Sequence, residues 1–194
     1  MSKKEQTEEL IKATAKKLFF VQGKFDATTQ EIADAAGVNR TLINYYFRSV
    51  ENLLRVIFDE ATAKEREKGR LIHKKDMTVK EKITAFVEQS LEQNLKYPYL
   101  ETYIVSQMNK GICINEDLDM STIDLFNTLI LEEMEKGNIE KMEPIQFTLN
   151  MISLLSFPNA ARHLLMDNLK IDEIEFDRIL AERKNIILNI LFKK

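Results

Sequence analysis

A chain of 194 residues with 44% hydrophobic and 30% charged residues has an ordinary globular composition, which excludes disorder along its whole length. Only five Gly and three Pro are present, and this scarcity of turn residues favours long helices over many short strands. The net charge of −3 is unevenly spread, because residues 1–55 hold nine Lys/Arg against seven Asp/Glu. A mildly basic N-terminal segment on an acidic chain is compatible with DNA binding through one end.

The residues that usually build metal, disulfide and catalytic sites are scarce. Cys113 is the single cysteine, so neither an intramolecular disulfide nor a cysteine-based zinc site can form. His73 and His163 lie far apart, and the sequence contains no Gly-x-Ser-x-Gly motif, phosphate-binding glycine loop or Cys–His pair. We therefore expect no metal, no cofactor and no enzyme. Without a signal peptide or a run of about 18 apolar residues, we expect a cytoplasmic protein with no membrane span.

The first predicted helix runs from Glu5 to Gln22, where apolar residues recur at helical spacing. Lys12, Lys16 and Lys17 lie off the apolar stripe, so we expect them to form a solvated face. Gly23 follows, as glycine often does just past the C-terminus of a helix.

A second, short helix is predicted to start at Thr28 or Thr29, since Thr28 and Glu31 have the spacing of a capping box. Gly37 supplies the positive φ that a sharp turn between two helices needs. A third helix over Arg40–Tyr46 follows, with Asn39 as its N-cap.

The rest of the chain is also predicted to be helical. Ser49 can cap a fourth helix, whose later part, 63–75, is highly charged. A loop is expected at 111–115, and Pro158 is expected to kink or end its helix. The remaining helices are predicted at 78–96, 98–110, 117–136, 144–168 and 172–192. The chain thus has about nine helices, by their period, and no convincing strand.

Residues 27–54 combine a short helix, a tight turn and a second short helix, which is the geometry of a helix-turn-helix. The second helix of such a unit enters the major groove, which is about 12 Å wide. We expect its inner side to bury Val38, Ile43 and Phe47. Its outer side offers arginine and asparagine, which can bind base edges, and hydroxyl groups that suit phosphates. These exposed residues are Arg40, Thr41, Asn44 and Tyr45.

This segment resembles the DNA-binding domain of TetR/AcrR-type regulators over roughly residues 7–55. The matching residues are Leu18-Phe19, Gly23, Thr28-Thr29, Ile32-Ala33, Ala36-Gly37-Val38, Tyr45-Tyr46-Phe47 and Ser49-Val50-Glu51-Asn52-Leu53. The family commonly has lysine, a phosphate contact in some members, where this chain has Val50, and Arg48 is a candidate to compensate. The resemblance implies that Arg40, Thr41 and Asn44 face bases while the other candidates lie near phosphates. The full DNA-binding set is Lys24, Thr28, Thr29, Arg40, Thr41, Asn44, Tyr45, Tyr46 and Arg48.

The resemblance also implies a division into a DNA-binding domain, 1–50, and a helical ligand-binding and dimerisation domain, 51–194. The helices at about 144–168 and 172–192 would pair with their counterparts in a homodimer, and the last of them is apolar on more than one face. Two recognition helices would then meet half-sites of a palindromic operator about 34–36 Å apart. A small molecule would release the regulator, which is a repressor in this interpretation, although the sequence does not separate repressor from activator.

Met and Phe residues in the body suggest an adaptable pocket for a hydrophobic or amphipathic ligand, although an ordinary core explains each of them as well. The candidate ligand contacts are Phe86, Gln89, Tyr103, Met108, Phe126, Met134, Phe147 and Met151. Asn109, Arg162 and His163 are further polar candidates. The alternative function is a helical protein-interaction module that has lost DNA binding. The exposed residues Arg40 and Tyr45 argue against it.

Overall fold

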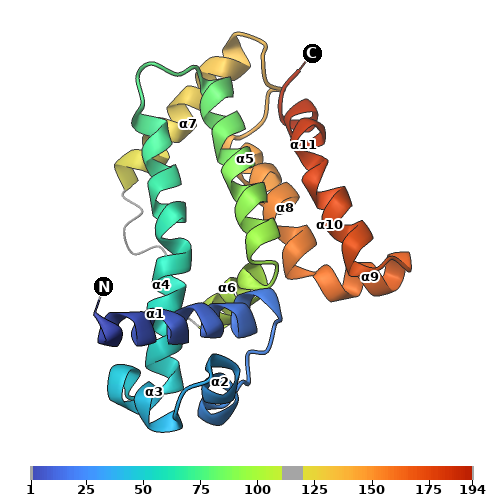
Figure 1. Cartoon of the computed structure of the whole chain (residues 1–194). Helices are drawn as coiled ribbons and strands as arrows, with labels where there is room; N and C mark the ends of the chain where they lie inside the picture. The colour runs from blue at the N-terminus through green and yellow to red at the C-terminus, as the bar shows by residue number, and fades with distance from the viewer. Residues whose placement is uncertain (1, 111–119, 194) are drawn as a thin grey trace.

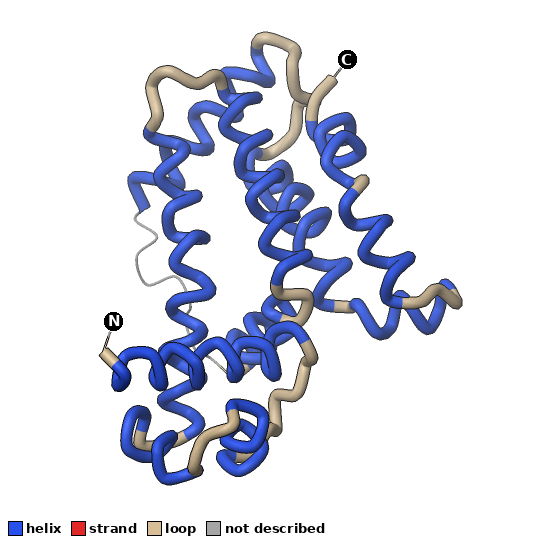
Figure 2. The backbone as a smooth tube through the Cα atoms, viewed as in Figure 1, coloured by secondary structure: helices blue, strands red, loops and turns tan. Residues whose placement is uncertain are grey.

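The computed structural model describes residues 2–110 and 120–193, and the side chains of residues 64–71 lie outside that description. The described residues form helices joined by loops, with no strand among them, so the all-α prediction is confirmed (Figure 2). Cys113 and the predicted loop at 111–115 lie outside the described residues. No helix in the described part of the chain combines the length and apolar character needed to cross a bilayer.

The N-terminal helices form a compact head at one end of the molecule (Figure 1). They are α1 (Lys3–Lys16), η1 (Lys17–Val21), α2 (Thr29–Ala36), α3 (Arg40–Phe47) and the start of α4 (Val50–Gly69). The core of the head is formed by buried side chains of α1 to α4. The contribution of α4 consists of Leu53, Ile57 and Ala61, and Leu100 of the body completes this core. Because α4 belongs to this core and then continues away from it, this helix carries the chain from head to body.

The first predicted helix changes character near its end. Lys17–Val21 form a π-helical turn, and the N–H of Gln22 donates to the carbonyl of Lys17 at 3.0 Å. A π turn spaces its hydrogen bonds five residues apart and so shifts the helix face locally. Here three successive side chains, Leu18, Phe19 and Phe20, are all buried in the core of the head.

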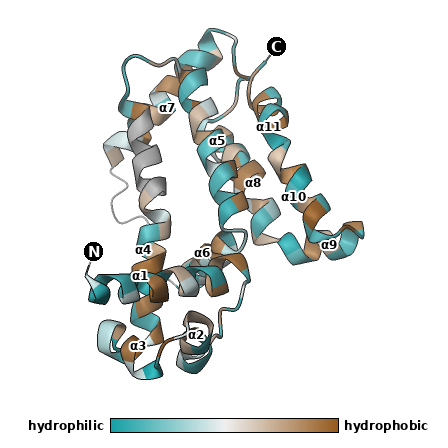
Figure 3. Ribbon diagram, viewed as in Figure 1, coloured by the Kyte–Doolittle hydropathy of each residue, from teal (hydrophilic) through white to brown (hydrophobic). Residues whose placement is uncertain are grey.

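The body contains the remaining helices, with η2 (Arg70–His73) at the end of α4. They are α5 (Val79–Lys96), α6 (Leu100–Asn109), α7 (Met120–Glu135), α8 (Pro144–Ala160), α9 (Arg162–Leu169), α10 (Glu173–Ala181) and α11 (Arg183–Leu191). A second core joins α5, α7, α8 and α11, and contains Ile83, Val87, Phe147 and Ile187. Hydrophobic and hydrophilic residues are mixed along α10 and α11 (Figure 3).

The predicted helix at 144–168 is two helices, and Pro158 lies in the last turn of the first of them, α8. Proline lacks an N–H, so it cannot donate to the carbonyl four residues earlier in the helix. That carbonyl belongs to Leu154, and it accepts instead from Nη2 of Arg183 in α11 at 3.1 Å. The carbonyl that Pro158 leaves free thus accepts a hydrogen bond that links α8 to α11. The predicted helix at 172–192 is likewise two helices, which are separated by Glu182.

Candidate nucleic-acid interface

The turn between α2 and α3 is built from local signals. Thr28 caps α2, since its hydroxyl accepts from the N–H of Glu31 at 3.3 Å while the Glu31 carboxylate accepts from the N–H of Thr28 at 2.8 Å. These hydrogen bonds from Thr28 lower the pKa of Glu31. Gly37 ends α2 with φ of 64° in the left-handed region. The capping box and the glycine together set the angle at which α3 leaves the turn.

The third helix, α3, has one buried and one exposed side. Asn39 caps it, because its side-chain oxygen accepts from the N–H of Thr41 at 2.9 Å and from the Thr41 hydroxyl at 2.7 Å. Ile43 and Phe47 are buried in the core of the head. The exposed side of α3 presents Arg40, Thr41, Asn44 and Tyr45. A helix of this kind can bring guanidinium, amide and hydroxyl groups to the edges of base pairs.

The two tyrosines of α3 have different environments. The Tyr45 side chain is 66% exposed, whereas Tyr46 is half-buried. The Tyr46 hydroxyl donates to the carbonyl of Lys4 at 3.2 Å, which ties α3 to the first turn of α1. The two rings meet edge to face with centroids 5.1 Å apart. The Tyr45 side chain is therefore accessible to a ligand, while the Tyr46 ring packs against Tyr45 and holds it in position.

The remaining predicted DNA contacts lie in the segments that precede and follow α3 in the chain. Lys24 is exposed in the loop before α2, and Thr29 is half-buried in its first turn. The Thr28 hydroxyl also donates to the Glu31 carboxylate at 2.7 Å, so the cap already uses this group. Arg48 ends α3 with φ of 66°, an uncommon value for a residue other than glycine. Its side chain is exposed to solvent, two residues before α4 begins.

The start of α4 shows why the missing lysine is tolerated structurally. Ser49 accepts from the N–H of Asn52 at 3.1 Å, as predicted for a cap. Val50 is half-buried and packs against the core of the head. At this position the chain thus gains an apolar contact where a lysine would supply a cation.

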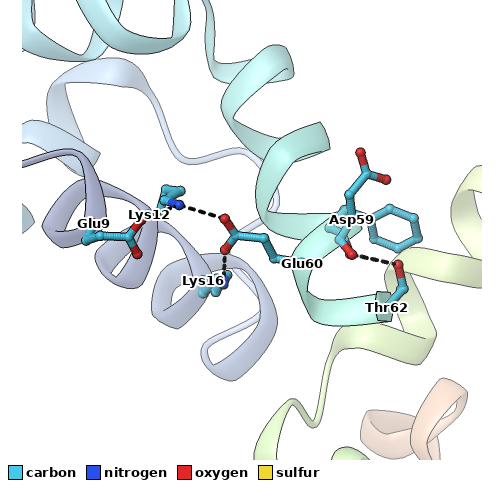
Figure 4. A network of polar contacts seen from close by, with 7 residues as sticks. Glu9, Lys12, Lys16, Asp59, Glu60 and Thr62 are labelled. Carbon is cyan, nitrogen blue, oxygen red and sulfur yellow. Dashed lines mark hydrogen bonds and ion pairs between the residues drawn. The ribbon is translucent and has the colours of Figure 1, made fainter. Parts of the chain in front are cut away.

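Lys17 is exposed as predicted, but Lys12 and Lys16 of α1 do not lie on a solvated face. Lys12 is buried, and its ammonium lies 2.6 Å from Oε1 of Glu60 on α4 (Figure 4). Lys16 pairs with the other oxygen of Glu60, and Glu9 also pairs with Lys12. Burial opposes the charge on Glu60, but the hydrogen bonds from the two lysines outweigh burial and lower the pKa of Glu60. The same carboxylates raise the pKa of Lys12 against the effect of its own burial.

The pairing of Glu60 makes the junction between α1 and α4 sensitive to acid. A carboxylate with a lowered pKa stabilises the fold above its unfolded pKa of about 4.3, and this stabilisation disappears as the pH falls through the folded pKa. We expect Glu60→Gln to lower the free energy of unfolding by about 1 kcal/mol at pH 7, since the pair is partly exposed to solvent. Urea unfolding at pH 7 and pH 3.5 should show that the difference is smaller in acid.

A matched control is Glu135→Gln, because Glu135 pairs with Lys141 where both side chains are mostly exposed. This control should leave the urea midpoint unchanged at both pH values. An equal loss of stability at pH 7 and pH 3.5 in Glu60→Gln would contradict an electrostatic role for Glu60.

A second junction connects the head to the loop before α6. The N–H of Tyr99 donates to the carbonyl of Phe20 at 3.0 Å, and the Tyr99 ring lies over Gly23. Tyr103 of α6 adds ring contacts with Phe20 at 5.7 Å and with Phe58 at 5.3 Å. Burial raises the pKa of Tyr103. Aromatic side chains from head and body therefore form one packed cluster.

The Tyr99 ring also contacts α9. The ring of His163 lies 5.3 Å from it, and the guanidinium carbon of Arg162 lies 5.9 Å from its centroid. Arg162 is 1% exposed, and its Nη2 donates to Asp177 of α10 at 2.7 Å. The Phe176 ring lies 4.9 Å from the same guanidinium. Arg162 thus joins α9 to α10 and reaches the loop that touches the head.

The predicted ligand contacts do not gather at one place. Five of them belong to or pack against the core of the body, namely Phe86, Phe126, Met134, Phe147 and Met151. Tyr103 packs against the core of the head. Gln89 and Met108 are exposed, as are Asn109 and His163. Within the described part of the chain, no three His, Cys, Asp or Glu side chains are grouped closely enough to hold a metal ion.

Exposed apolar side chains gather on the last four helices. On α8, Ile145, Leu149 and Ile152 follow one another at helical spacing and are 58%, 49% and 48% exposed. On α11, Ile186 and Ile190 are 52% and 58% exposed. The opposite sides of these helices fill the core of the body. Both helices therefore have a second apolar face, which the single chain leaves in water.

Comparisons with known proteins agree with this geometry. Residues 11–57 match the model of bacterial regulatory proteins of the tetR family. No curated protein matches the chain. The solved structure of HlyIIR, a hemolysin II transcriptional regulator, is 20% identical and has a TM-score of 0.65, with 98% of this chain and 99% of that chain covered. A TetR family transcription regulator from Marinobacter aquaeolei VT8 is 12% identical, with a TM-score of 0.59 and 98% and 97% coverage.

Proposed function

Since the chain belongs, through residues 11–57, to the tetR family of bacterial regulatory proteins, we propose that it is a repressor that binds a palindromic operator as a homodimer. The observation that carries the proposal is the two-sided character of α3. Ile43 and Phe47 hold the helix to the core, while Arg40 and Asn44 stand exposed on its other side. Arginine and asparagine are the side chains suited to guanine and adenine edges in the major groove.

The homodimer is supported by the second apolar faces of α8 and α11. Contiguous exposed apolar surface on a folded chain marks a place where another protein binds. A two-fold dimer would bury the same surface on both subunits and place two α3 helices on one side of the assembly. Such a pair suits an inverted repeat with half-sites about one helical turn apart.

We further propose that a small hydrophobic or amphipathic molecule releases the repressor from DNA. The supporting observation is the group of Phe and Met side chains in the core of the body, because methionine adapts to irregular apolar ligands. The ligand must bind one spacing of the two recognition helices more tightly than the other, or the equilibrium does not shift.

Selection of bound sequences from a random duplex-DNA pool, at a stated salt concentration, tests the operator proposal. We expect the purified dimer to recover an inverted repeat. A folded dimer that recovers no common sequence, even after extensive dialysis to remove small molecules, would contradict the proposal.

The recovered sequence allows a test of Arg40. We expect Arg40→Ala to weaken operator binding by about 1–3 kcal/mol and to relax the preference at one base pair of each half-site. Arg40→Lys keeps the charge but loses the planar guanidinium, so it should also relax that preference. Quantitative binding to single-base variants of the operator measures both effects. An unchanged preference in both variants would show that Arg40 does not contact a base.

A further inference from the structure

The first turn of α1 lies against the recognition helix, and the two tyrosines of α3 surround Lys4. The ammonium of Lys4 lies 5.5 Å from the centroid of the Tyr45 ring. Its backbone carbonyl accepts from the Tyr46 hydroxyl at 3.2 Å. An ammonium over the face of a tyrosine ring is attracted by the ring quadrupole. Lys4 is thus placed next to the exposed tyrosine of the candidate interface.

A capping box at the start of α1 also holds the backbone around Lys4 in place. Ser2 caps α1, and its N–H donates to the carboxylate of Glu5 at 2.8 Å in a capping box. The first turn therefore has its own hydrogen bonds in addition to the one from Tyr46. Lys4 projects from an ordered turn, which reduces the conformational entropy that its contact with a ligand would cost.

The charge of Lys4 is available, unlike that of the lysines further along α1. Lys12 and Lys16 both pair with Glu60 on α4, and Lys12 also pairs with Glu9, so two carboxylates balance their two charges. Lys4 is exposed and has no carboxylate within ion-pair distance among the described residues. Tyr45 carries no charge of its own. Lys4 thus brings an unpaired positive charge beside the exposed face of α3.

We infer that Lys4 is a DNA-binding residue, whose ammonium contacts a backbone phosphate beside the one reached by Tyr45. This inference rests on the proposed function. A lysine is a compact charge on a flexible stem, which suits a phosphate oxygen and carries no information about base sequence. The Tyr45 ring positions the ammonium before DNA arrives. The contact surface of the head therefore extends from α3 to the first turn of α1.

The dependence of binding on salt tests this inference directly. Each phosphate neutralised by a lysine contributes about 0.9 to the slope of log K against log salt. We expect Lys4→Ala to reduce this slope by about 0.9 per subunit. The affinity should fall to the same extent for operator and for unrelated duplex DNA, because a phosphate contact is independent of sequence. Lys4→Arg keeps the charge and should keep the slope.

The chain offers a matched control in Lys80. Its ammonium also lies 5.5 Å from an aromatic centroid, that of Phe192, but on the body. Lys80→Ala should leave the slope and the affinity as they are in the parent protein. Tyr45→Phe retains the ring and should retain the effect of Lys4→Ala, whereas Tyr45→Ala should make that effect smaller.

The outcomes separate this inference from the proposed function. A parent protein that binds no operator overturns the proposed function. A parent protein that binds, with the same salt slope in Lys4→Ala, overturns the assignment of Lys4. A slope that falls equally in Lys4→Ala and Lys4→Arg also overturns it, since the role of the side chain would then be structural and not electrostatic.

Discussion

Aspartate in place of both Ile152 and Ile186 is expected to leave the chain folded but monomeric, with operator affinity reduced by about 10²–10⁴-fold. Both side chains are about half exposed in the single chain, so a carboxylate there meets water and costs the monomer little. In the proposed dimer the same carboxylates would be buried without partners, which opposes association. A monomer loses the effective concentration that the first bound half-site gives the second recognition helix.

Sedimentation and DNA titration would measure the two parts of this prediction. The double variant should sediment as a monomer and bind a full operator no better than a single half-site. Leu131→Asp on α7 is a matched control, because Leu131 is 47% exposed but lies outside the proposed face. A double variant that stays dimeric would place the subunit contact elsewhere.

Gly23→Ala is expected to destabilise the fold by about 2–4 kcal/mol, for two reasons that add. The backbone there has φ of 68°, where a side chain is strained. A Cβ atom would also stand 3.0 Å from Cδ1 of Tyr99 and 3.1 Å from Cε1, which is tighter than nine in ten Cβ contacts and would push the ring away. Since Tyr99 is buried and its ring also contacts His163 of α9, the ring has little room to retreat.

Gly37→Ala separates the two causes. Its φ of 64° is nearly the same, but a Cβ atom there meets nothing within 4 Å. We expect this variant to cost about 1–2 kcal/mol, the backbone share alone. Urea unfolding of both variants at pH 7 compares the costs. Equal losses would mean that the Tyr99 ring moves freely and does not constrain the head.

What could be predicted from the sequence depended on how far apart the interacting residues lie. The capping box of Thr28 with Glu31 was predicted and is confirmed, because it spans only three residues. The ion pairs of Lys12 could not be predicted, since Glu60 lies 48 residues away. A lysine on a helical pattern looks solvated until its distant partner is known. The π-helical turn was missed because Lys17–Val21 is as apolar and helical in pattern as its neighbours.

The candidate interface was more predictable than the rest of the functional surface. The period of α3 separates Ile43 and Phe47 from Arg40 and Asn44, and the structure places these side chains on opposite sides as expected. The two tyrosines could not both be buried on so short a helix, and Tyr45 is the exposed one. Ligand contacts in the body have no such local signal. A methionine that lines a pocket and one that fills a core look alike in sequence.

The contact of Tyr99 with Gly23 limits how the head can move. The head joins the body along α4 and again at Tyr99, whose N–H donates to the Phe20 carbonyl and whose ring lies against Gly23. Leu100 and Tyr103 of α6 also pack into or against the core of the head, so the head is attached to the body over a packed area and not at a single hinge. A change in the separation of two α3 helices would therefore require this packing to shift together with α4.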